Sequence, residues 1–562
     1  MNVFRRSGLA PFNLIASILI FSIFLPASQE EISEKEKKQK PITEEIIVEA
    51  ERPKDVLLAT TSMIRREKIE ATASKDLSEI LSYASGTFLS TGVKGEFRLK
   101  VRGFESQSIA LLYDGIPIYE PFFNSFDCKT VIAEDIESIK VVKGASSVLY
   151  GPNSLGGVVN IITRRPASPS FSMKTSYDSN KTSLITSTTA LHWRHIFFAG
   201  SVSLEKSEGF RWNKNGENVL RKNSDYERKN FTGKLYFYPT EKSEVLLETA
   251  YYSSEFGIPS ATEFYRPRFW RFKNWNRFQL HLGGTFSFLK KGYLKLRSYY
   301  VRHDNVLDAY SDEDMSKRRW KSTYNNDSYG IFFLGTFPYS SGNEWRWSFN
   351  FRNDTARTQD DVGEEWNEFQ HQTYSFGVES HIELNAEWGL IGGVSLDHLR
   401  KQSGRTKSSI NPIIGIKHNS HEFFDFRLSL AQKSRFPSMK SLYSAQGGNP
   451  DLREERGTSY EAGLTYDREI FIQGAVFFNR IHDLIKTIRL PDGSKTSLNI
   501  GKADIFGLEL EVSKDLRWLN LSFSYTYLDG KNKVEDQPLD LFPKSQLNFF
   551  SRLRIAKKLR LS

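Results

Sequence analysis

Few side chains of this 562-residue chain have the types and spacing that covalent chemistry requires. Ser146 lies in a Gly-Ala-Ser-Ser run, which lacks the G-x-S-x-G pattern of a nucleophile elbow, and no Gly-Lys-Ser/Thr follows as in a phosphate loop. His418 and His421 stand three residues apart in a predicted short turn, where we expect solvated side chains rather than metal ligands. A single cysteine, Cys128, excludes an intramolecular disulfide. We therefore predict no enzyme, no catalytic residue, no metal site and no cofactor, which leaves recognition by charged and aromatic side chains.

The N-terminal residues have the pattern of an export signal. Arg5 and Arg6 precede an apolar stretch over residues 14–25, and the small residues Ala27 and Ser28 follow it. We expect residues 1–28 to be a cleaved signal peptide, with a single N-terminal membrane anchor as the alternative. Residues 29–43 are charged and nearly free of large apolar side chains, which predicts a flexible tether. The mature chain would thus begin with a loose arm in an exported compartment.

A short β-branched run follows the tether at residues 44–50. Such a run at the end of a flexible arm is suited to adding as a strand to the sheet edge of a partner, where main-chain hydrogen bonds give affinity. The alternative is an ordinary first strand of the domain that follows. The residues concerned are Glu45, Ile46, Ile47, Val48, Glu49 and Ala50.

Two regions with different periodicity make up the rest of the chain. Over residues 51–165 the pattern is mixed: Ser74 is predicted to cap a helix over residues 75–81, and β-rich runs at 97–101, 109–113 and 136–142 each end near a glycine. This predicts a small α+β domain. Over residues 170–562, segments of about ten residues alternate apolar and polar side chains between short turns and long polar loops such as 205–230 and 253–276.

The alternation favours an all-β transmembrane antiparallel barrel over a soluble sandwich. Phe506, Leu508 and Leu510 alternate with Gly507 and Glu509, so one face would meet lipid and the other a wet interior. Aromatic residues gather at segment ends, as in the girdles of membrane barrels. The short turns predict about 18 strands, with a further strand beginning at Leu559 and an error of about two strands. The aromatic residues at the segment ends include Trp345, Trp347, Trp388 and Trp518.

Several motifs, in order along the chain, resemble those of TonB-dependent outer-membrane receptors. In the α+β region, Val101-Arg102-Gly103-Phe104 resembles the V/I-R-G-F of that family, and Asp114-Gly115-Ile116-Pro117 resembles its D-G-x-P. Residues 136–151 and 156–163 are similar to the signature of the plug domain, and 448–452, 460–463 and 507–511 are similar to motifs late in the barrel. The resemblance covers residues 44–562 and implies a 22-stranded barrel filled by an N-terminal plug over residues 51–165.

The resemblance also implies residue roles and partners. Residues 44–50 resemble the TonB box, which the inner-membrane protein TonB would pull, because the outer membrane has no ATP or ion gradient of its own. Basic plug residues of the family pair with barrel glutamates, and the matching positions are Arg102 and Lys143 with Glu461 and Glu509. Lys143 stands where the family usually has arginine, and lysine lacks the bidentate fork that arginine offers to a carboxylate. Separately solvated charges are the alternative.

The implied activity is active uptake of a scarce, bulky ligand, most simply a ferric siderophore or another iron chelate. The basic excess of the barrel region within a net charge of +10 favours an anion, although lipopolysaccharide phosphates explain it equally well. The aromatic residues of the plug loops would stack on ligand or pack in the plug core. The ligand-contact residues expected in the outward plug loops are Lys94, Glu105, Gln107, Tyr119, Phe122 and Phe123.

Alternatives to siderophore uptake stay open at this point. Cobalamin is one variant, and haem is less favoured because all ten histidines lie at or beyond His192, outside the plug. A passive porin is opposed by the plug, while an adhesin or phage receptor would use the long loops. We expect a monomer in the cell outer membrane, in contact with lipopolysaccharide, with no nucleic-acid partner.

The C-terminal strands depart from the family pattern. The sequence stops as the nineteenth predicted strand begins, and an open sheet edge in lipid would leave unpaired main-chain groups, each costing on the order of several kcal/mol. An incomplete sequence, a truncated gene and closure with fewer strands would each account for this. We expect truncation, with a barrel that lacks its C-terminal strands or a receptor that no longer functions.

Overall fold

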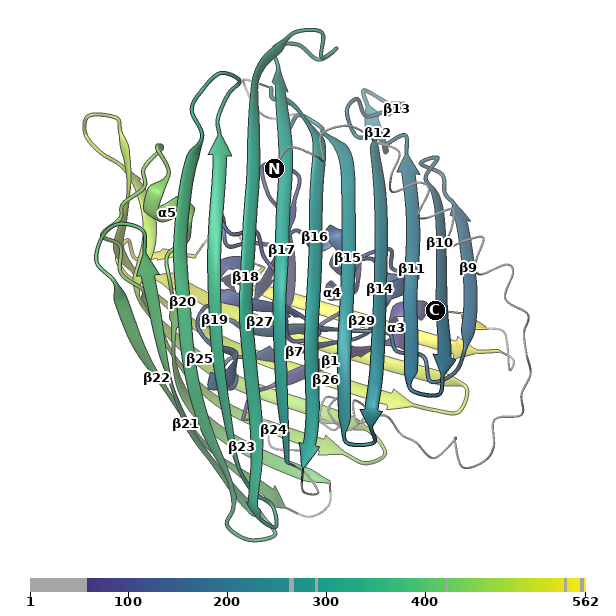
Figure 1. Cartoon of the computed structure of the whole chain (residues 1–562), viewed down its shortest axis with the longest axis vertical. Coiled ribbons are helices and arrows are strands. Elements are labelled where there is room, and N and C mark those ends of the chain that lie inside the picture. The colour runs from purple at the N-terminus through teal and green to yellow at the C-terminus, as the bar shows by residue number, and fades with distance from the viewer. Residues whose placement is uncertain are drawn as a thin grey trace.

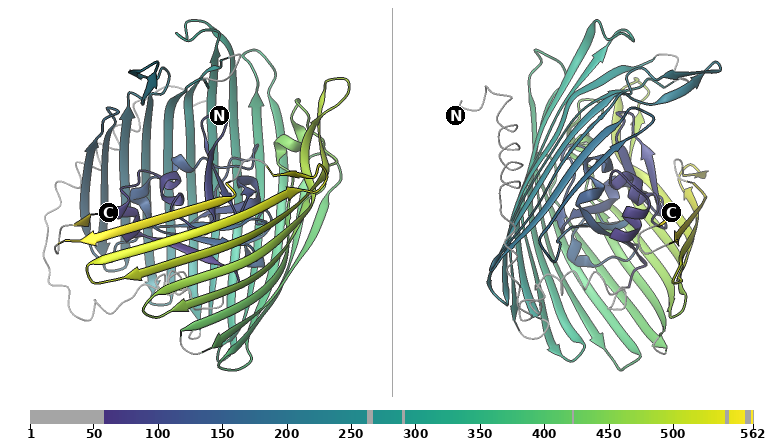
Figure 2. Two further views of the ribbon diagram at one scale, coloured as in Figure 1. Left: turned by 180° about the vertical axis from the view of Figure 1, so that it is seen from behind. Right: turned by 90° about the vertical axis from the view of Figure 1, so that its right-hand side faces the viewer.

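The computed structural model describes residues 58–261, 267–288, 292–420, 423–539, 543–555 and 560–561, so the predicted signal peptide, tether and TonB box lie outside the described residues. A wall of long strands curves around a smaller domain, drawn purple to dark blue in Figure 1. The right-hand view of Figure 2 places this plug domain between the early strands, in teal, and the late strands, in yellow.

The plug begins with a strand and two short helices, α3 (Arg66–Ala71) and α4 (Leu77–Leu81). The prediction that Ser74 caps the second helix is wrong. Because the helix starts at Leu77, the residue in the capping position is Asp76, whose carboxylate accepts hydrogen bonds from the backbone N–H groups of Ser78 and Glu79. Within the described residues, no helix is long and apolar enough to cross a membrane.

Two sheets form the body of the plug. The larger has the strand order β1-β7-β8-β5-β6, in which only β5 and β8 run parallel, and the smaller has the order β2-β3-β4. Ile139, Val141 and Val159 of the larger sheet pack with Leu77 and Leu81 of α4 in one buried cluster, which holds the helix on the sheet. The strands are β1 (Thr61–Arg65), β2 (Thr87–Thr91), β3 (Phe97–Val101), β4 (Phe104–Glu105), β5 (Ile109–Tyr113), β6 (Ile116–Pro117), β7 (Ile136–Lys143) and β8 (Gly157–Thr163), with single 3₁₀ turns at Ser106–Ser108, Cys128–Thr130, Ala133–Asp135 and Val148–Tyr150.

Nineteen strands of the described residues make up the wall, and the two-residue β28 (Gln537–Pro538) pairs beside β27. Each pairs antiparallel with the next wall strand along the chain. They are β9 (Ser170–Tyr177), β10 (Ser183–Trp193), β11 (Ile196–Ser207), β14 (Tyr226–Thr240), β15 (Ser243–Ile258), β16 (Phe269–Phe288), β17 (Gly292–Tyr310), β18 (Arg318–Ser340), β19 (Asn343–Gln359), β20 (Asn367–Glu383), β21 (Trp388–Lys401), β22 (Lys407–Ser420), β23 (Phe424–Arg435), β24 (Glu455–Asp467), β25 (Phe471–Arg489), β26 (Lys495–Asp515), β27 (Leu519–Asn532), β29 (Ser545–Arg554) and β30 (Arg560–Leu561).

Alternation along these strands sorts the side chains as predicted. Phe506, Leu508 and Leu510 of β26 are each 39% exposed on the outer face, whereas Glu509 between them is 6% exposed and faces the plug. The same period of two recurs around the wall, which confirms the predicted class of an antiparallel membrane barrel with a plug. In Figure 1, β14 to β18 run nearly vertically, while the late strands, drawn in yellow, cross behind them closer to the horizontal.

The predicted loops at 205–230 and 253–276 are largely strand, and this prediction is wrong. β14 starts at Tyr226, β15 continues to Ile258 and β16 starts at Phe269, while a hairpin of β12 (Arg211–Lys214) and β13 (Glu217–Leu220) fills the first loop. Polar side chains mark the end of the lipid-facing part of a strand but not the end of its main-chain hydrogen bonding. The paired strands therefore extend beyond the lipid-facing part.

Candidate functional site

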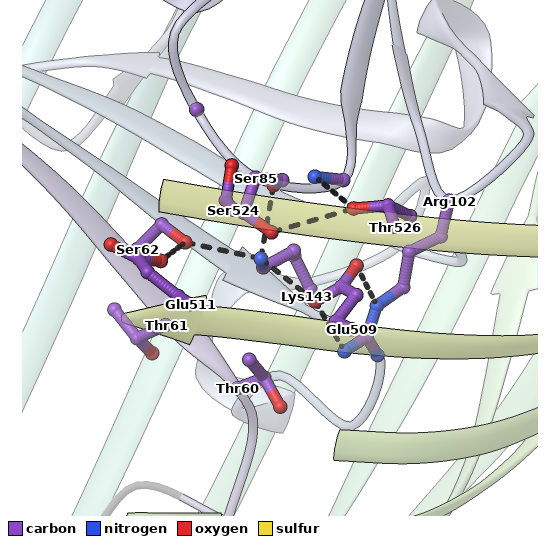
Figure 3. A network of polar contacts seen from close by, with 12 residues as sticks. Thr60, Thr61, Ser62, Ser85, Arg102, Lys143, Glu509, Glu511, Ser524 and Thr526 are labelled. Atoms are coloured by element: carbon purple, nitrogen blue, oxygen red, sulfur yellow. Dashed lines mark hydrogen bonds and ion pairs between the residues drawn. The ribbon is translucent and has the colours of Figure 1, made fainter. Parts of the chain in front are cut away.

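The plug and the wall meet at four buried charges, which we call the ionic cluster: Arg102, Lys143, Glu461 and Glu509. Arg102 stands in a tight turn between β3 and β4, where it has a φ of +50° and is followed by Gly103 at +83°. Its Nε and Nη2 donate to the two carboxylate oxygens of Glu509 at 2.9 and 3.1 Å, and its Nη1 donates to Oε2 of Glu461 at 2.6 Å. One guanidinium therefore binds two carboxylates from two strands of the wall; Figure 3 shows its contact with Glu509.

Lys143 completes the ionic cluster from the end of β7. Its Nζ lies 2.9 Å from Oε2 of Glu509 and donates to Ser62 Oγ at 3.1 Å and to the carbonyl oxygen of Ser85 at 3.0 Å. These three partners match the three donors of an ammonium group. Lysine thus binds one carboxylate oxygen rather than forming the bidentate pair an arginine would give, and the remaining donors bind plug residues (Figure 3).

The wall supplies both negative charges from inward positions of two strands. Glu461 lies on β24 and Glu509 on β26, and on the strand between them, β25, Phe477 pairs with Glu461 while Ala475 pairs with Glu509. The Phe477 ring lies against the Arg102 guanidinium, with 3.8 Å between Cζ of Arg102 and the ring centroid. The two cations and two anions of the ionic cluster balance one another, which offsets part of the cost of burying them.

No motif in the sequence indicated the polar residues that surround the ionic cluster. The backbone N–H and the hydroxyl of Thr60 both donate to Oε1 of Glu461, at 2.8 and 2.6 Å, and Arg427 donates to the same hydroxyl at 2.8 Å. Ser62 donates to Glu511 at 3.1 Å. The bonds of Thr60 join residues more than 360 positions apart, and no periodicity marks them.

Gly144 sets how closely the plug turn approaches the ionic cluster. Its φ is +73°, and a Cβ there would lie 2.8 Å from Oε2 of Glu461 and 2.9 Å from Nη1 of Arg102. We expect Gly144→Ala to destabilise the protein by about 2 kcal/mol or more, since the left-handed conformation alone costs about 1–2 kcal/mol for an L-residue. The midpoint of urea denaturation of the detergent-solubilised protein measures this.

Gly216 provides a matched control for that substitution. Its φ is +91°, and nothing lies within 4 Å of the position that a Cβ would take. Gly216→Ala should therefore show the cost of the backbone conformation alone. Equal losses for the two variants would contradict a close approach of Gly144 to the ionic cluster.

A second group of residues lies at the outward loops of the plug. Lys94, in the turn between β2 and β3, has its Nζ 4.9 Å from the ring centroids of both Phe123 and Tyr324. Lys440, in the short helix α5 (Met439–Tyr443) between β23 and β24, has its Nζ 5.1 Å from the Phe123 ring. Neither ammonium group forms an ion pair with a carboxylate of the described residues. A cavity lies against the same face, lined in part by Lys94, Phe123 and Lys440.

Glu120 shapes the loop that carries these aromatic residues. Its carboxylate accepts hydrogen bonds from the backbone N–H groups of Phe122 at 2.9 Å and Phe123 at 2.7 Å, and Asn326 of β18 also donates to it. Burial raises the pKa of Glu120 to about 7 despite these bonds and the nearby Lys94. Burial likewise lowers the pKa of the Lys94 ammonium, an effect that Glu96 and Glu120 only partly oppose.

The other predicted ligand residues have different surroundings. Phe122 is buried at 5% exposure against Tyr324, and Tyr119 donates to the carboxylate of Asp354 on β19, at 2.8 and 2.9 Å to its two oxygens. Gln107 donates to the carbonyl oxygen of Phe123 at 2.9 Å, while Glu105 pairs with Lys100 at 3.1 Å. Of the aromatic residues, Phe123 is thus the one placed between two cations, whereas Phe122 and Tyr119 hold the plug against the wall.

Family models match nearly the whole described chain. The plug region, residues 53–158, matches the TonB-dependent Receptor Plug Domain, and residues 148–557 match the TonB dependent receptor-like beta-barrel. The chain belongs to the TonB-dependent receptor family. Members of this family are outer-membrane transporters and receptors rather than enzymes.

Individual relatives are distant in sequence but similar in fold. The Vitamin B12 transporter BtuB of Photobacterium profundum is 22% identical over 513 residues, which cover 87% of this chain and 78% of the relative. The solved structure of the Copper transporter OprC superposes with a TM-score of 0.76 at 16% identity, covering 88% of this chain and 84% of that one. The solved structure of the siderophore receptor PirA from Acinetobacter baumannii superposes with a TM-score of 0.73 at 18% identity, covering 89% of this chain and 84% of that one.

Proposed function

We propose that this protein is a TonB-energised outer-membrane transporter that takes up a bulky anionic chelate, in the first place a ferric siderophore. The ionic cluster carries the proposal. A domain that fills the barrel interior and is fixed to the wall by buried ion pairs blocks passive flow, so transport needs work from outside the outer membrane. That arrangement opposes a passive porin.

The work would be delivered through residues 44–50. This β-branched run, Glu45 to Ala50 included, is proposed to add as a strand to TonB, and the charged tether before it keeps the run accessible. The chain would act as a monomer, with the outward leucine and phenylalanine side chains of its strands in lipid and lipopolysaccharide.

The group around Phe123 supports an anionic ligand with aromatic or apolar surface. Lys94 and Lys440 approach one ring without a carboxylate partner among the described residues, and burial lowers the pKa of both ammonium groups. An anion placed between the two ammonium groups would stabilise their charged forms, which burial disfavours. The Phe123 ring offers a surface on which an aromatic or apolar part of the ligand could stack. Cobalamin is the second candidate, favoured by the similarity to the vitamin B12 transporter BtuB.

Replacing both lysines should weaken binding of an anionic chelate selectively. We expect the double variant Lys94→Gln/Lys440→Gln to bind a ferric tricatecholate about a hundredfold or more weakly, since each of the two charge-assisted contacts contributes about 1.5–3 kcal/mol and every 1.4 kcal/mol is about tenfold in affinity. Surface binding and uptake of ⁵⁵Fe-labelled tricatecholate and ⁵⁷Co-labelled cyanocobalamin are measured in cells that lack other receptors, with and without TonB.

Lys222→Gln is the matched control, because this lysine lies in an outer loop and pairs with Glu313 and Asp314 at the surface. TonB-dependent uptake of the ferric chelate that falls only in the double variant supports the proposal. Uptake of cyanocobalamin alone, unchanged by the lysine substitutions, would replace the siderophore with cobalamin. Uptake of either ligand without TonB would contradict active transport.

A further inference from the structure

Thr60 lies where the N-terminal segment enters the plug, ten residues after the end of the proposed TonB box at Ala50. Leu58, two residues before it, packs against Ile413 and Ala431 of the wall. β1 begins at Thr61 and pairs with β7, whose last residue is Lys143. The segment is thus the first described part of the chain that a pull on residues 44–50 would reach.

Thr60 binds the same carboxylate as the plug arginine. Oε1 of Glu461 accepts both the backbone N–H and the hydroxyl of Thr60, while Oε2 accepts Nη1 of Arg102. The Thr60 hydroxyl in turn accepts from Nη2 of Arg427 at 2.8 Å, and Nε of Arg427 lies 3.8 Å from Glu461. We call Thr60, Arg427 and Glu461 the clasp.

The clasp also reaches the second cation of the ionic cluster. The backbone N–H of Lys143 donates to the carbonyl oxygen of Thr60 at 3.0 Å, and the Lys143 side chain donates to Ser62. Ser62 donates onward to Glu511 of β26 (Figure 3). Thr60 and Ser62 are therefore both hydrogen-bonded to the ionic cluster, on either side of Thr61.

We propose that Thr60 is the positioning residue that transmits the pull to the ionic cluster. Withdrawing it removes two donors from a buried carboxylate oxygen and one acceptor from Lys143, before any part of the sheet core has to move. A carboxylate that loses donors in a buried site is destabilised, so the ion pairs that fix the plug weaken at the first step of the pull.

The clasp can be tested without a ligand or TonB. Ala59→Cys places a thiol beside Thr60 at a buried position, 4% exposed in the parent chain, so its reaction with maleimide reports opening of the segment. We expect Thr60→Val to speed this reaction about tenfold, because the hydroxyl bonds to Glu461 and Arg427 are lost while the shape is kept. The full-length protein in nanodiscs is used, and labelled peptides are quantified by mass spectrometry.

Three controls separate a positioning role from general loosening of the plug. The natural Cys128, buried in the plug core, should label at an unchanged rate. Thr60→Ser should behave as the parent chain, since it keeps the hydroxyl that bonds to Glu461 and Arg427. In a Glu461→Gln background the effect of Thr60→Val should shrink, because the charged acceptor is gone.

An unchanged rate at position 59 in Thr60→Val, or an equal increase at Cys128, would overturn the proposal. So would an undiminished effect in the Glu461→Gln background. The direction of the pull rests on the proposed function, but the labelling requires no transport. A protein that fails to take up ligand and still shows the clasp therefore refutes the proposed function alone.

Discussion

Deletion of residues 45–50 is expected to reduce energised uptake to the level of cells without the receptor, while binding of ligand at the cell surface stays unchanged. The deleted run is the strand that we propose TonB engages. The residues that we propose to bind ligand, by contrast, lie in loops of the plug and in α5. Uptake and surface binding of labelled ferric tricatecholate at 37 °C and on ice measure the two separately.

A deletion of equal length in the tether, residues 34–39, is the matched control. It shortens the arm by the same six residues but leaves the β-branched run intact, so most of the uptake should remain. Loss of surface binding in the 45–50 deletion would indicate that these residues belong to the plug fold, which was the alternative interpretation. Uptake at the parent rate would instead favour a surface protein that does not depend on TonB.

Periodicity predicted the wall well because one physical rule acts on every strand. Side chains alternate between lipid and interior, so Leu508 and Glu509 reveal their faces from their order alone. Strand ends were predicted less well, since main-chain pairing continues into polar segments such as the start of β14 at Tyr226. The helix cap was misplaced from Asp76 to Ser74 because both residue types favour that position.

Site residues could be predicted from the sequence only where they belong to a recognisable motif. Arg102, Lys143, Glu461 and Glu509 were named through resemblance, and the structure brings these four side chains together. Thr60 carries no motif. Its bond to Glu461 spans 401 positions, and such a contact depends on how the plug is rotated inside the wall rather than on any local pattern. Lys440 was missed for the same reason, because only the fold brings α5 to Phe123.

Removing the central cation should have the largest effect on how the plug is held. In Arg102→Met, Glu461 loses its 2.6 Å ion pair and keeps only the 3.8 Å contact with Arg427, while Glu509 keeps Lys143, so both buried carboxylates lose a directly bonded cation. Breaking a buried pair by removing one partner costs about 3–5 kcal/mol. We expect a loss of that size in stability to urea, together with larger and more frequent conductance events in planar bilayers as the plug leaves the barrel.

Restoring charge balance should recover part of this loss. Arg102→Met/Glu461→Gln leaves the pair Lys143 and Glu509 within the ionic cluster, and the amide oxygen at position 461 can still accept from Thr60. Because apolar or neutral replacements of a whole buried pair are often nearly neutral in stability, the double variant should be more stable than Arg102→Met alone. Arg98→Met, which removes a plug arginine whose side chain is 36% exposed, should change little. A double variant as unstable as Arg102→Met would mean that the shape of the guanidinium over Phe477, rather than the balance of charge, fixes the plug to the wall.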